Sequence, residues 1–184
     1  GKKQYQNSKS LLGLKSINLL QVHNLVNYSK HLEYMTELKS QGHIKYIGVT
    51  TSHGRRHNEL INVMKTYDID FIQMTYNILD TECENYILPL AKEKGIAVMA
   101  NRPFQGGNLF SYVKNVDIPK WLKEVGINSW AELFIKFTIS NPSVTCSIPA
   151  TSNEKHMVEN MESMYGNLLS EKLRLRSRRF ILDL

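Results

Sequence analysis

Polar side chains follow five short apolar runs of the sequence, at the points where the runs stop. They are His23-Asn24, Thr50-Thr51-Ser52, residues 73–77, Asn101-Arg102-Pro103 and Thr151-Ser152. Because ligands bind at the carboxyl ends of the strands in parallel α/β sheets, these groups could face one site. Strands of any domain also end at the surface, so the set alone is a mild indication of function.

His23 is the best candidate for acid–base chemistry, because imidazole titrates near neutral pH. A histidine after a strand is, however, more often a hydrogen-bonded structural residue. His53 and His57 have a spacing that can hold zinc, but no third ligand accompanies them, so we expect no metal site. Residues 105–107 (QGG) could let the backbone approach a phosphate, or could simply begin a flexible loop. Cys146 lies inside an apolar run and is expected to be an inert, buried thiol.

The apolar runs are near-continuous rather than alternating, which is typical of strands buried on both faces of a parallel sheet. We expect strands at residues 17–23, 44–50, 70–76, 97–102 and 144–149. Helical spacing and end signals predict helices at residues 29–42, 57–67, 81–94, 129–139 and 153–164, the first and the last three with the N-caps Ser29, Thr81, Ser129 and Asn153. Residues 106–126 are expected to form a long irregular loop.

Composition places the chain among ordinary globular proteins. It has 184 residues, of which 42% are hydrophobic and 22% charged, and no apolar run is as long as a membrane span. The two cysteines form no metal-type pair, so we expect reduced thiols and a cytoplasmic location. The net charge is +6, with basic residues gathered at both ends. We expect one domain over residues 1–184, with a polar lead-in at 1–16 and a basic tail at 166–184.

Alternating strands and helices predict right-handed β-α-β units, and these fit two architectures. One is an open doubly wound sheet and the other is most of a (β/α)8 barrel, which typically needs ~250 residues. The first strand is followed by the sequence VHNLV rather than by a glycine-rich dinucleotide fingerprint, which counts against a Rossmann domain.

Five stretches resemble consecutive parts of the aldo-keto reductase family, in family order and with family spacing. Residues 19–25 (LLQVHNL) resemble its fourth barrel strand, residues 42–50 (GHIKYIGVT) its fifth, and residues 70–77 (DFIQMTYN) its sixth. Residues 95–107 (GIAVMANRPFQGG) resemble its seventh strand and phosphate loop, and residues 144–160 its last strand and adenosine-phosphate motif. The resemblance implies an α/β fold, a partial (β/α)8 TIM barrel of five parallel strands with helices, in which the three N-terminal β/α units are absent.

The resemblance also implies roles for single residues. His23 matches the active-site histidine, which orients and polarises the substrate carbonyl. The positions that hold the nicotinamide carboxamide are Thr50, Thr51 and Gln73. Asn101 stands where many members have a tyrosine that stacks on the nicotinamide ring.

The other matched positions would hold the rest of the dinucleotide. Those in the loop along the pyrophosphate are Arg102, Pro103, Phe104 and Gly106. Thr151 and His156 match positions near the adenosine 2′-phosphate, where many members have Ser and Arg, and Glu159 and Asn160 match the pair that contacts the adenine. The resemblance therefore implies NADPH as cofactor, with NADH possible because His156 is a weaker phosphate partner than Arg.

Family members deliver a proton from a tyrosine supported by a lysine and an aspartate, all on the first three β/α units. This chain begins just before the fourth strand, and we do not assign Tyr5 or Lys9 to those roles. The expected function is NADPH-dependent reduction of an aldehyde or ketone, and the partners expected are a small carbonyl substrate and another chain that covers the open barrel edges.

Two alternatives stay open. One is a truncated, catalytically inactive remnant that at most binds nucleotide or a partner chain. The other is a basic interaction protein that uses residues 170–184. The basic tail has little aromatic interleaving, which disfavours nucleic acid, and we expect no membrane partner.

Overall fold

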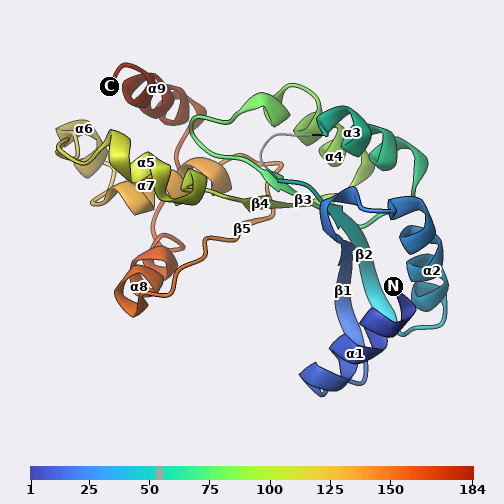
Figure 1. The fold of residues 1–184 in the computed structure, drawn as a ribbon. Helices are drawn as coiled ribbons and strands as arrows, with labels where there is room; N and C mark the ends of the chain where they lie inside the picture. Colours follow the sequence, from blue (N-terminus) through green and yellow to red (C-terminus); the bar gives the residue numbers. More distant parts are fainter. Residues whose placement is uncertain (53–55) are drawn as a thin grey trace.

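Five parallel strands form one sheet in the computed structural model, which describes residues 1–52 and 56–184 (Figure 1). The strands are β1 (Ile17–Val22), β2 (Ile44–Thr50), β3 (Phe71–Thr75), β4 (Ala97–Asn101) and β5 (Cys146–Ser147). All five predicted strands are present. Their order in the sheet, β1-β2-β3-β4-β5, follows the chain without reversing, so the sheet has no switch point of the doubly wound kind. The architecture is therefore that of a partial (β/α)8 barrel.

Strand β5 is shorter than the predicted 144–149. It pairs with β4 through Met99 opposite Cys146 and Ala100 opposite Ser147. Single backbone hydrogen bonds extend the pairing on both sides, because Thr145 N–H donates to the Val98 carbonyl and Ile148 N–H donates to the Ala100 carbonyl. Pro149 then ends the ladder, since proline has no N–H to donate.

The helices are α1 (Lys2–Leu12), α2 (Tyr28–Ser40), α3 (His57–Thr66), α4 (Ile87–Lys94), α5 (Asn108–Tyr112), α6 (Lys120–Lys123), α7 (Trp130–Ile139), α8 (Glu154–Glu162) and α9 (Glu171–Leu182). Single 3₁₀ turns occupy His23–Leu25, Glu82–Glu84 and Gln105–Gly107. Helices α2, α3 and α4 lie along one side of the sheet, and α8 and α1 lie at opposite ends of the molecule (Figure 1). None of the helices within residues 1–52 and 56–184 has the length and apolar character that crossing a membrane requires.

Two of the four predicted N-caps are confirmed. The Ser129 side chain accepts from Glu132 N–H, and the Asn153 side chain accepts from Lys155 N–H. Ser29 is wrong as a cap, because α2 already begins at Tyr28 after Asn27 in a left-handed conformation (φ 50°). Thr81 is also wrong, because it precedes a 3₁₀ turn, and α4 begins only at Ile87.

Three segments contain helices that the sequence did not predict. The polar lead-in at 1–16 holds α1, the loop at 106–126 holds the short helices α5 and α6, and the basic tail at 166–184 holds α9. Helix α1 buries a single apolar side chain, Tyr5, and the residues that α9 buries are Arg174, Ser177 and Ile181. Neither α1 nor α9 therefore carries an apolar stripe with helical period, and without that stripe the sequence did not predict these two helices.

One hydrophobic core joins the outward face of the sheet to the helices that cover it. A smaller cluster, Leu122, Ile127, Leu133 and Leu169, lies under α6, α7 and the segment before α9. At the amino ends of the strands, the Asp70 carboxylate accepts from Lys39 Nζ at 2.6 Å and from Ile47 N–H at 2.9 Å. These contacts fix the start of β3 against β2 and α2.

Candidate functional site

A cavity of about 780 Å³ opens beyond the carboxyl end of β4. The residues that line it come from the loop after β4, from α5 and α7, and from the segment that joins β5 to α8. They are Asn101, Arg102, Pro103, Phe104, Gly106, Gly107, Phe110, Ala131, Ile148, Ala150, Thr151, His156, Glu159 and Asn160. Nine of the predicted nucleotide-binding residues are in this set, although they come from sequence segments about 45 residues apart.

The loop after β4 turns sharply along one wall of the cavity. Arg102, Gln105, Gly106 and Gly107 all have left-handed backbones, with φ of 53°, 51°, 70° and 95°. A Cβ on Gly106 would lie 3.1 Å from Arg102 Nη2, so the guanidinium packs directly over this glycine. Gln105 N–H donates to the Arg102 carbonyl and Gly107 N–H to the Phe104 carbonyl, each at 2.9 Å, so the Arg102 guanidinium is the group on this wall that suits an anion such as a phosphate.

Helix α8 forms the facing wall. Thr151 Oγ1 accepts from Asn153 N–H at 3.1 Å, and Asn153 Oδ1 accepts from Lys155 N–H at 2.9 Å, so two side chains shape the entry into the helix. Asn160, near the other end of α8, is only 7% exposed. Its Nδ2 is buried and has no hydrogen-bond partner among the described residues. A buried amide donor without a partner is costly, and a ligand in the cavity would relieve that cost.

Asn101 joins three strand ends instead of pointing freely at a ligand. Its Nδ2 donates to the Thr51 carbonyl after β2 at 2.9 Å, and its Oδ1 accepts from Thr75 Oγ1 of β3 at 2.9 Å. Thr51 N–H in turn donates to the Gln73 carbonyl at 2.8 Å. Two predicted carboxamide-site positions, Thr51 and Gln73, are thus tied to Asn101 in one hydrogen-bonded edge.

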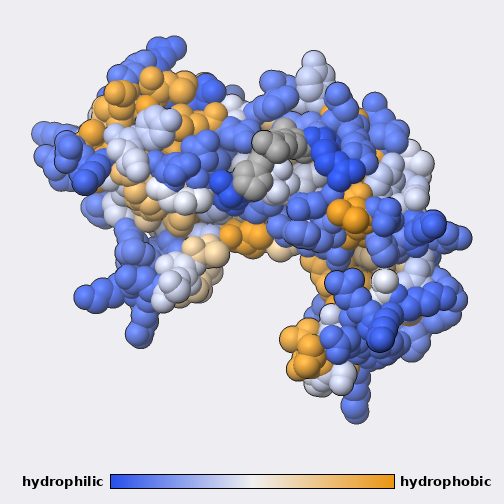
Figure 2. All heavy atoms as spheres, viewed as in Figure 1, coloured by the Kyte–Doolittle hydropathy of each residue, from blue (hydrophilic) through white to orange (hydrophobic). Residues whose placement is uncertain are grey.

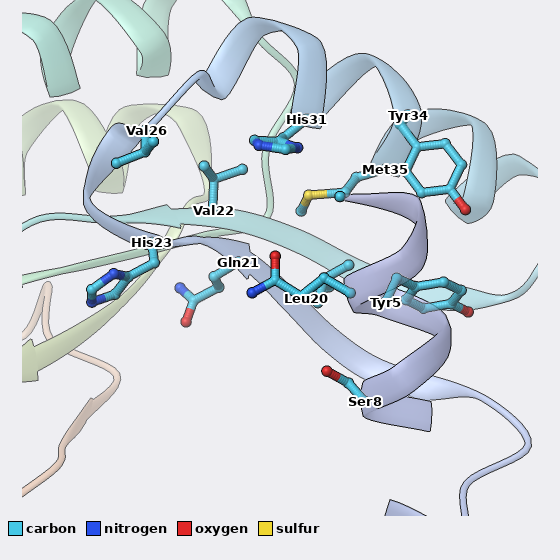
Figure 3. Close-up of a pocket in the computed structure, with 12 residues that line it drawn as sticks. Tyr5, Ser8, Leu20, Gln21, Val22, His23, Val26, His31, Tyr34 and Met35 are labelled. Carbon is cyan, nitrogen blue, oxygen red and sulfur yellow. The ribbon is translucent and has the colours of Figure 1, made fainter. Parts of the chain in front are cut away.

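His23 lies further along the same edge, at the end of β1, and is exposed. The turn that follows it is held by Thr50, whose Oγ1 accepts from Asn24 N–H at 2.9 Å, and by Arg56, which donates to the Asn24 carbonyl. His23 lines a second cavity, of about 400 Å³, between β1, α1 and α2 (Figure 3). The structure therefore separates His23 from the nine residues of the larger cavity, and hydrogen bonds through Thr50 and Thr51 connect the two regions.

Tyr5 and Lys9, which the sequence analysis leaves unassigned, lie one turn apart on α1. The Lys9 ammonium sits 5.8 Å from the centre of the Tyr5 ring, and Tyr34 packs edge-on against that ring at 6.4 Å. Burial, and next the Tyr34 hydroxyl, raise the pKa of Tyr5. A general-acid tyrosine needs the opposite shift, so this pair does not form a proton-donating site.

Sequence reasoning missed several lining residues. Phe110 of α5 stacks obliquely on Phe104 at 5.1 Å and adds an aromatic wall to the cavity. Ala131, Ile148 and Ala150 also line it. Phe110 lies in a segment expected to be an irregular loop, and no periodic pattern there could have marked it.

The described residues bring no three histidine, cysteine or acidic side chains close enough together to hold a metal ion. His53, one half of the His53–His57 pair, lies outside the described residues. Cys83 and Cys146 are both free thiols, and burial raises the pKa of each. Cys146 is only half-buried, against the prediction of full burial, because it lies in the outer strand β5.

The model of the aldo/keto reductase family matches residues 2–174. A Bacillus subtilis (strain 168) protein, "uncharacterized oxidoreductase YqkF", is 26% identical over 189 residues, which cover 89% of this chain and 60% of that protein. The "NADH-specific methylglyoxal reductase" of Escherichia coli (strain K12) is 34% identical over 88 residues, 46% of this chain and 25% of that enzyme. The chain thus spans less than two thirds of the length of these relatives.

Solved structures show the same fold. The apo form of aldo-keto reductase AKR11C1 from Bacillus halodurans superimposes with a TM-score of 0.78 at 22% identity, over 98% of this chain and 67% of that one. An aldo/keto reductase from Klebsiella pneumoniae, in complex with NADP and acetate, gives a TM-score of 0.77 at 22% identity, over 96% of this chain and 62% of that one.

Proposed function

Because this chain belongs to the aldo/keto reductase family, we propose that it forms the nucleotide-binding part of an NAD(P)H-dependent reductase of aldehydes or ketones. One observation carries the proposal. Nine residues that the family resemblance assigns to the dinucleotide line a single cavity, and the buried Asn160 amide in that cavity lacks a partner. A volume of about 780 Å³ is in the range of known cofactor sites.

The residues in the cavity fit a dinucleotide. The loop from Arg102 to Gly107 offers the Arg102 guanidinium for the pyrophosphate, and Glu159 and Asn160 offer an acceptor and a donor for the adenine. When bound, the nicotinamide would supply the hydride for carbonyl reduction. Strand ends held together by Asn101 would present Thr50, Thr51 and Gln73 to the carboxamide.

We propose NADPH as the preferred cofactor, with NADH as the alternative. The cavity carries two basic side chains, Arg102 and His156, that could meet a 2′-phosphate, and one acidic side chain, Glu159, that would oppose it. Imidazole is a weaker phosphate partner than a guanidinium, so the preference for NADPH is expected to be modest. The E. coli relative described as NADH-specific keeps the second option open.

His23 would orient and polarise the substrate carbonyl. Tyr5, which lines the same cavity as His23, has a pKa raised by burial and is therefore not primed as a proton donor. We therefore expect this chain by itself to bind nucleotide and to reduce aldehydes orders of magnitude more slowly than a complete site would. This keeps the catalytically inactive remnant as the second candidate function.

Equilibrium titration with NADPH and with NADH tests the proposal, and His156→Glu is the informative variant. A carboxylate at this position would repel the 2′-phosphate, so NADPH binding should weaken at least tenfold. Lys155→Gln is the matched control, because it makes the same −1 change of charge at the next, exposed residue, which does not line the cavity. Equal effects of the two variants, or no binding of either nucleotide to the parent chain, would refute the proposal.

A further inference from the structure

The loop at residues 102–107, which follows β4, has an unusual backbone conformation. Arg102 and Gln105 are left-handed although neither is glycine, with φ of 53° and 51°. This conformation costs free energy in a residue with a side chain, and it persists where neighbouring contacts fix it. The contacts of the Arg102 backbone therefore determine where the Arg102 guanidinium lies.

Two contacts from the segment after β3 hold this loop to the rest of the sheet. Tyr76 N–H donates to the Asn101 carbonyl at 3.3 Å, and Asn77 Nδ2 donates to the Arg102 carbonyl at 3.1 Å. The Arg102 carbonyl also accepts from Gln105 N–H at 2.9 Å, so both of its lone pairs are engaged. Figure 2 shows that the molecule is hollowed between the part that carries α8 and the part that carries α1, and the loop leads into α5 on the α8 side. The contacts from β3 therefore set the position of the loop relative to the sheet.

Asn77 is fully buried, and both polar atoms of its side chain are hydrogen-bonded. Its Oδ1 accepts from Leu79 N–H and from Asp80 N–H, each at 3.0 Å, and so forms the turn that follows β3. Aspartate and asparagine both make such turns, because only the acceptor oxygen is used. Donation to the Arg102 carbonyl, in contrast, is possible for the amide and not for a carboxylate. The contact with Arg102, rather than the turn, therefore explains why an amide stands at position 77.

We propose that Asn77 is a positioning residue for the nucleotide site. It fixes the Arg102 backbone in the left-handed conformation and thereby holds the Arg102 guanidinium over Gly106, at the wall of the cavity beyond β4. Asn77 does not itself line that cavity, so it acts on a ligand through Arg102, whose guanidinium suits a phosphate. The inference rests on the proposed function, because the ligand that Arg102 would meet is the nucleotide.

Asn77→Asp isolates the donated hydrogen bond. The ionised carboxylate keeps the acceptor for the turn, but it places an oxygen without a proton against the Arg102 carbonyl. The dissociation constant of NADP⁺ should therefore rise about fivefold or more near pH 7.5. Asn85→Asp is the matched control, because it makes the same −1 change of charge at an exposed residue of the same β3–α4 connection, and its NADP⁺ affinity should stay within about twofold of the parent.

The pH dependence of Asn77→Asp separates positioning from a general loss of stability. A protonated carboxyl can donate to the Arg102 carbonyl again, so the loss of NADP⁺ affinity relative to the parent should shrink as the pH is lowered from about 7.5 to about 5. The parent is measured at each pH as the reference. It contains the same neighbouring titratable groups, which are Asp80 on the same turn and the two residues that interact with Asp80, His57 and Glu82.

Asn77→Ser gives a second test that adds no charge. The serine hydroxyl can accept in the turn but is too short to reach the Arg102 carbonyl. NADP⁺ affinity should therefore fall when the rest of the chain is unchanged, and it should change by less than about twofold in an Arg102→Gln background, where the guanidinium is already absent. In the nucleotide-free chain, the NMR signals of the backbone amides of residues 102–107 should shift in Asn77→Ser and stay in place in Asn85→Asp.

Three results would overturn the proposal. They are an NADP⁺ affinity of Asn77→Asp equal to that of Asn85→Asp near pH 7.5, an equal loss from Asn77→Ser with and without Arg102, and unshifted amides at residues 102–107. Absence of NADP⁺ binding to the parent chain would instead refute the proposed function, and the amide shifts would then decide by themselves whether Asn77 holds the loop.

Discussion

Asn101→Ala is expected to destabilise the edge of the sheet at the candidate site. The Asn101 side chain is 8% exposed and makes two buried hydrogen bonds, each of 2.9 Å, to the Thr51 carbonyl and from the Thr75 hydroxyl. Each buried hydrogen bond contributes about 1 kcal/mol net, and the acceptor that loses its donor adds a desolvation cost. The free energy of unfolding should fall by about 2–3 kcal/mol.

Thermal unfolding measures this effect. At roughly 2–4 °C per kcal/mol for a chain of this size, the melting temperature should fall by about 5–10 °C. Asn128→Ala is the matched control, because Asn128 is exposed and makes one side-chain hydrogen bond at 3.2 Å to the Gly126 carbonyl. It should change the melting temperature by no more than about 2 °C. If the two variants melt within a degree of one another, Asn101 does not tie the strand ends together as described.

Three further substitutions test other contacts. Gly48→Ala should cost about 3 kcal/mol or more, because the new Cβ would lie 2.3 Å from the Phe71 carbonyl oxygen; soluble protein with unchanged urea midpoint would contradict this. Burial raises the pKa of Asp80 in the folded protein, so stability is lost as the pH rises from the unfolded-state pKa through the folded-state pKa. Asp80→Asn should therefore raise the melting temperature at pH 7 and lose this advantage at acid pH, once the Asp80 carboxyl is protonated in both states; a constant difference between the two conditions would be inconsistent. Arg174→Met should cost about 2 kcal/mol by removing its 2.5 Å ion pair with Glu84, less than for a fully buried pair because the Glu84 side chain is 34% exposed. A double-mutant cycle with Glu84→Gln measures the coupling, and a value near zero would show that the ion pair contributes little.

The strands could be predicted from the sequence because each is a continuous apolar run, and burial on both faces requires such a run. The helices α2, α3, α7 and α8 followed from apolar spacing or from a local cap. Helix α9 could not be predicted in this way. Its inward face is built on Arg174, which pairs with Glu84, donates to the Tyr76 hydroxyl and stacks 4.9 Å from the centre of the Phe137 ring. In the sequence, a buried arginine looks the same as a solvent-exposed one, because the partners that allow its burial lie far away along the chain.

The candidate site likewise has a part that the sequence predicts and a part that it does not. Nine residues that line the larger cavity were predictable because they occur in short linear motifs, and the fold brings those motifs together. The linkage of Asn101 to Thr51 and Thr75 joins positions 26 and 50 residues apart, and no local pattern marks it. The position of Phe110 depended on a short helix in a segment without periodicity.

An NMR titration of the isotope-labelled chain with NADP⁺ tests most directly whether the cavity beyond β4 holds a dinucleotide. The account predicts that the largest amide shifts fall in residues 102–107 and 153–160, and that the Asn160 side-chain amide shifts as its buried Nδ2 gains a partner. An unchanged spectrum at millimolar nucleotide, or shifts confined to the cavity around His23, would contradict it.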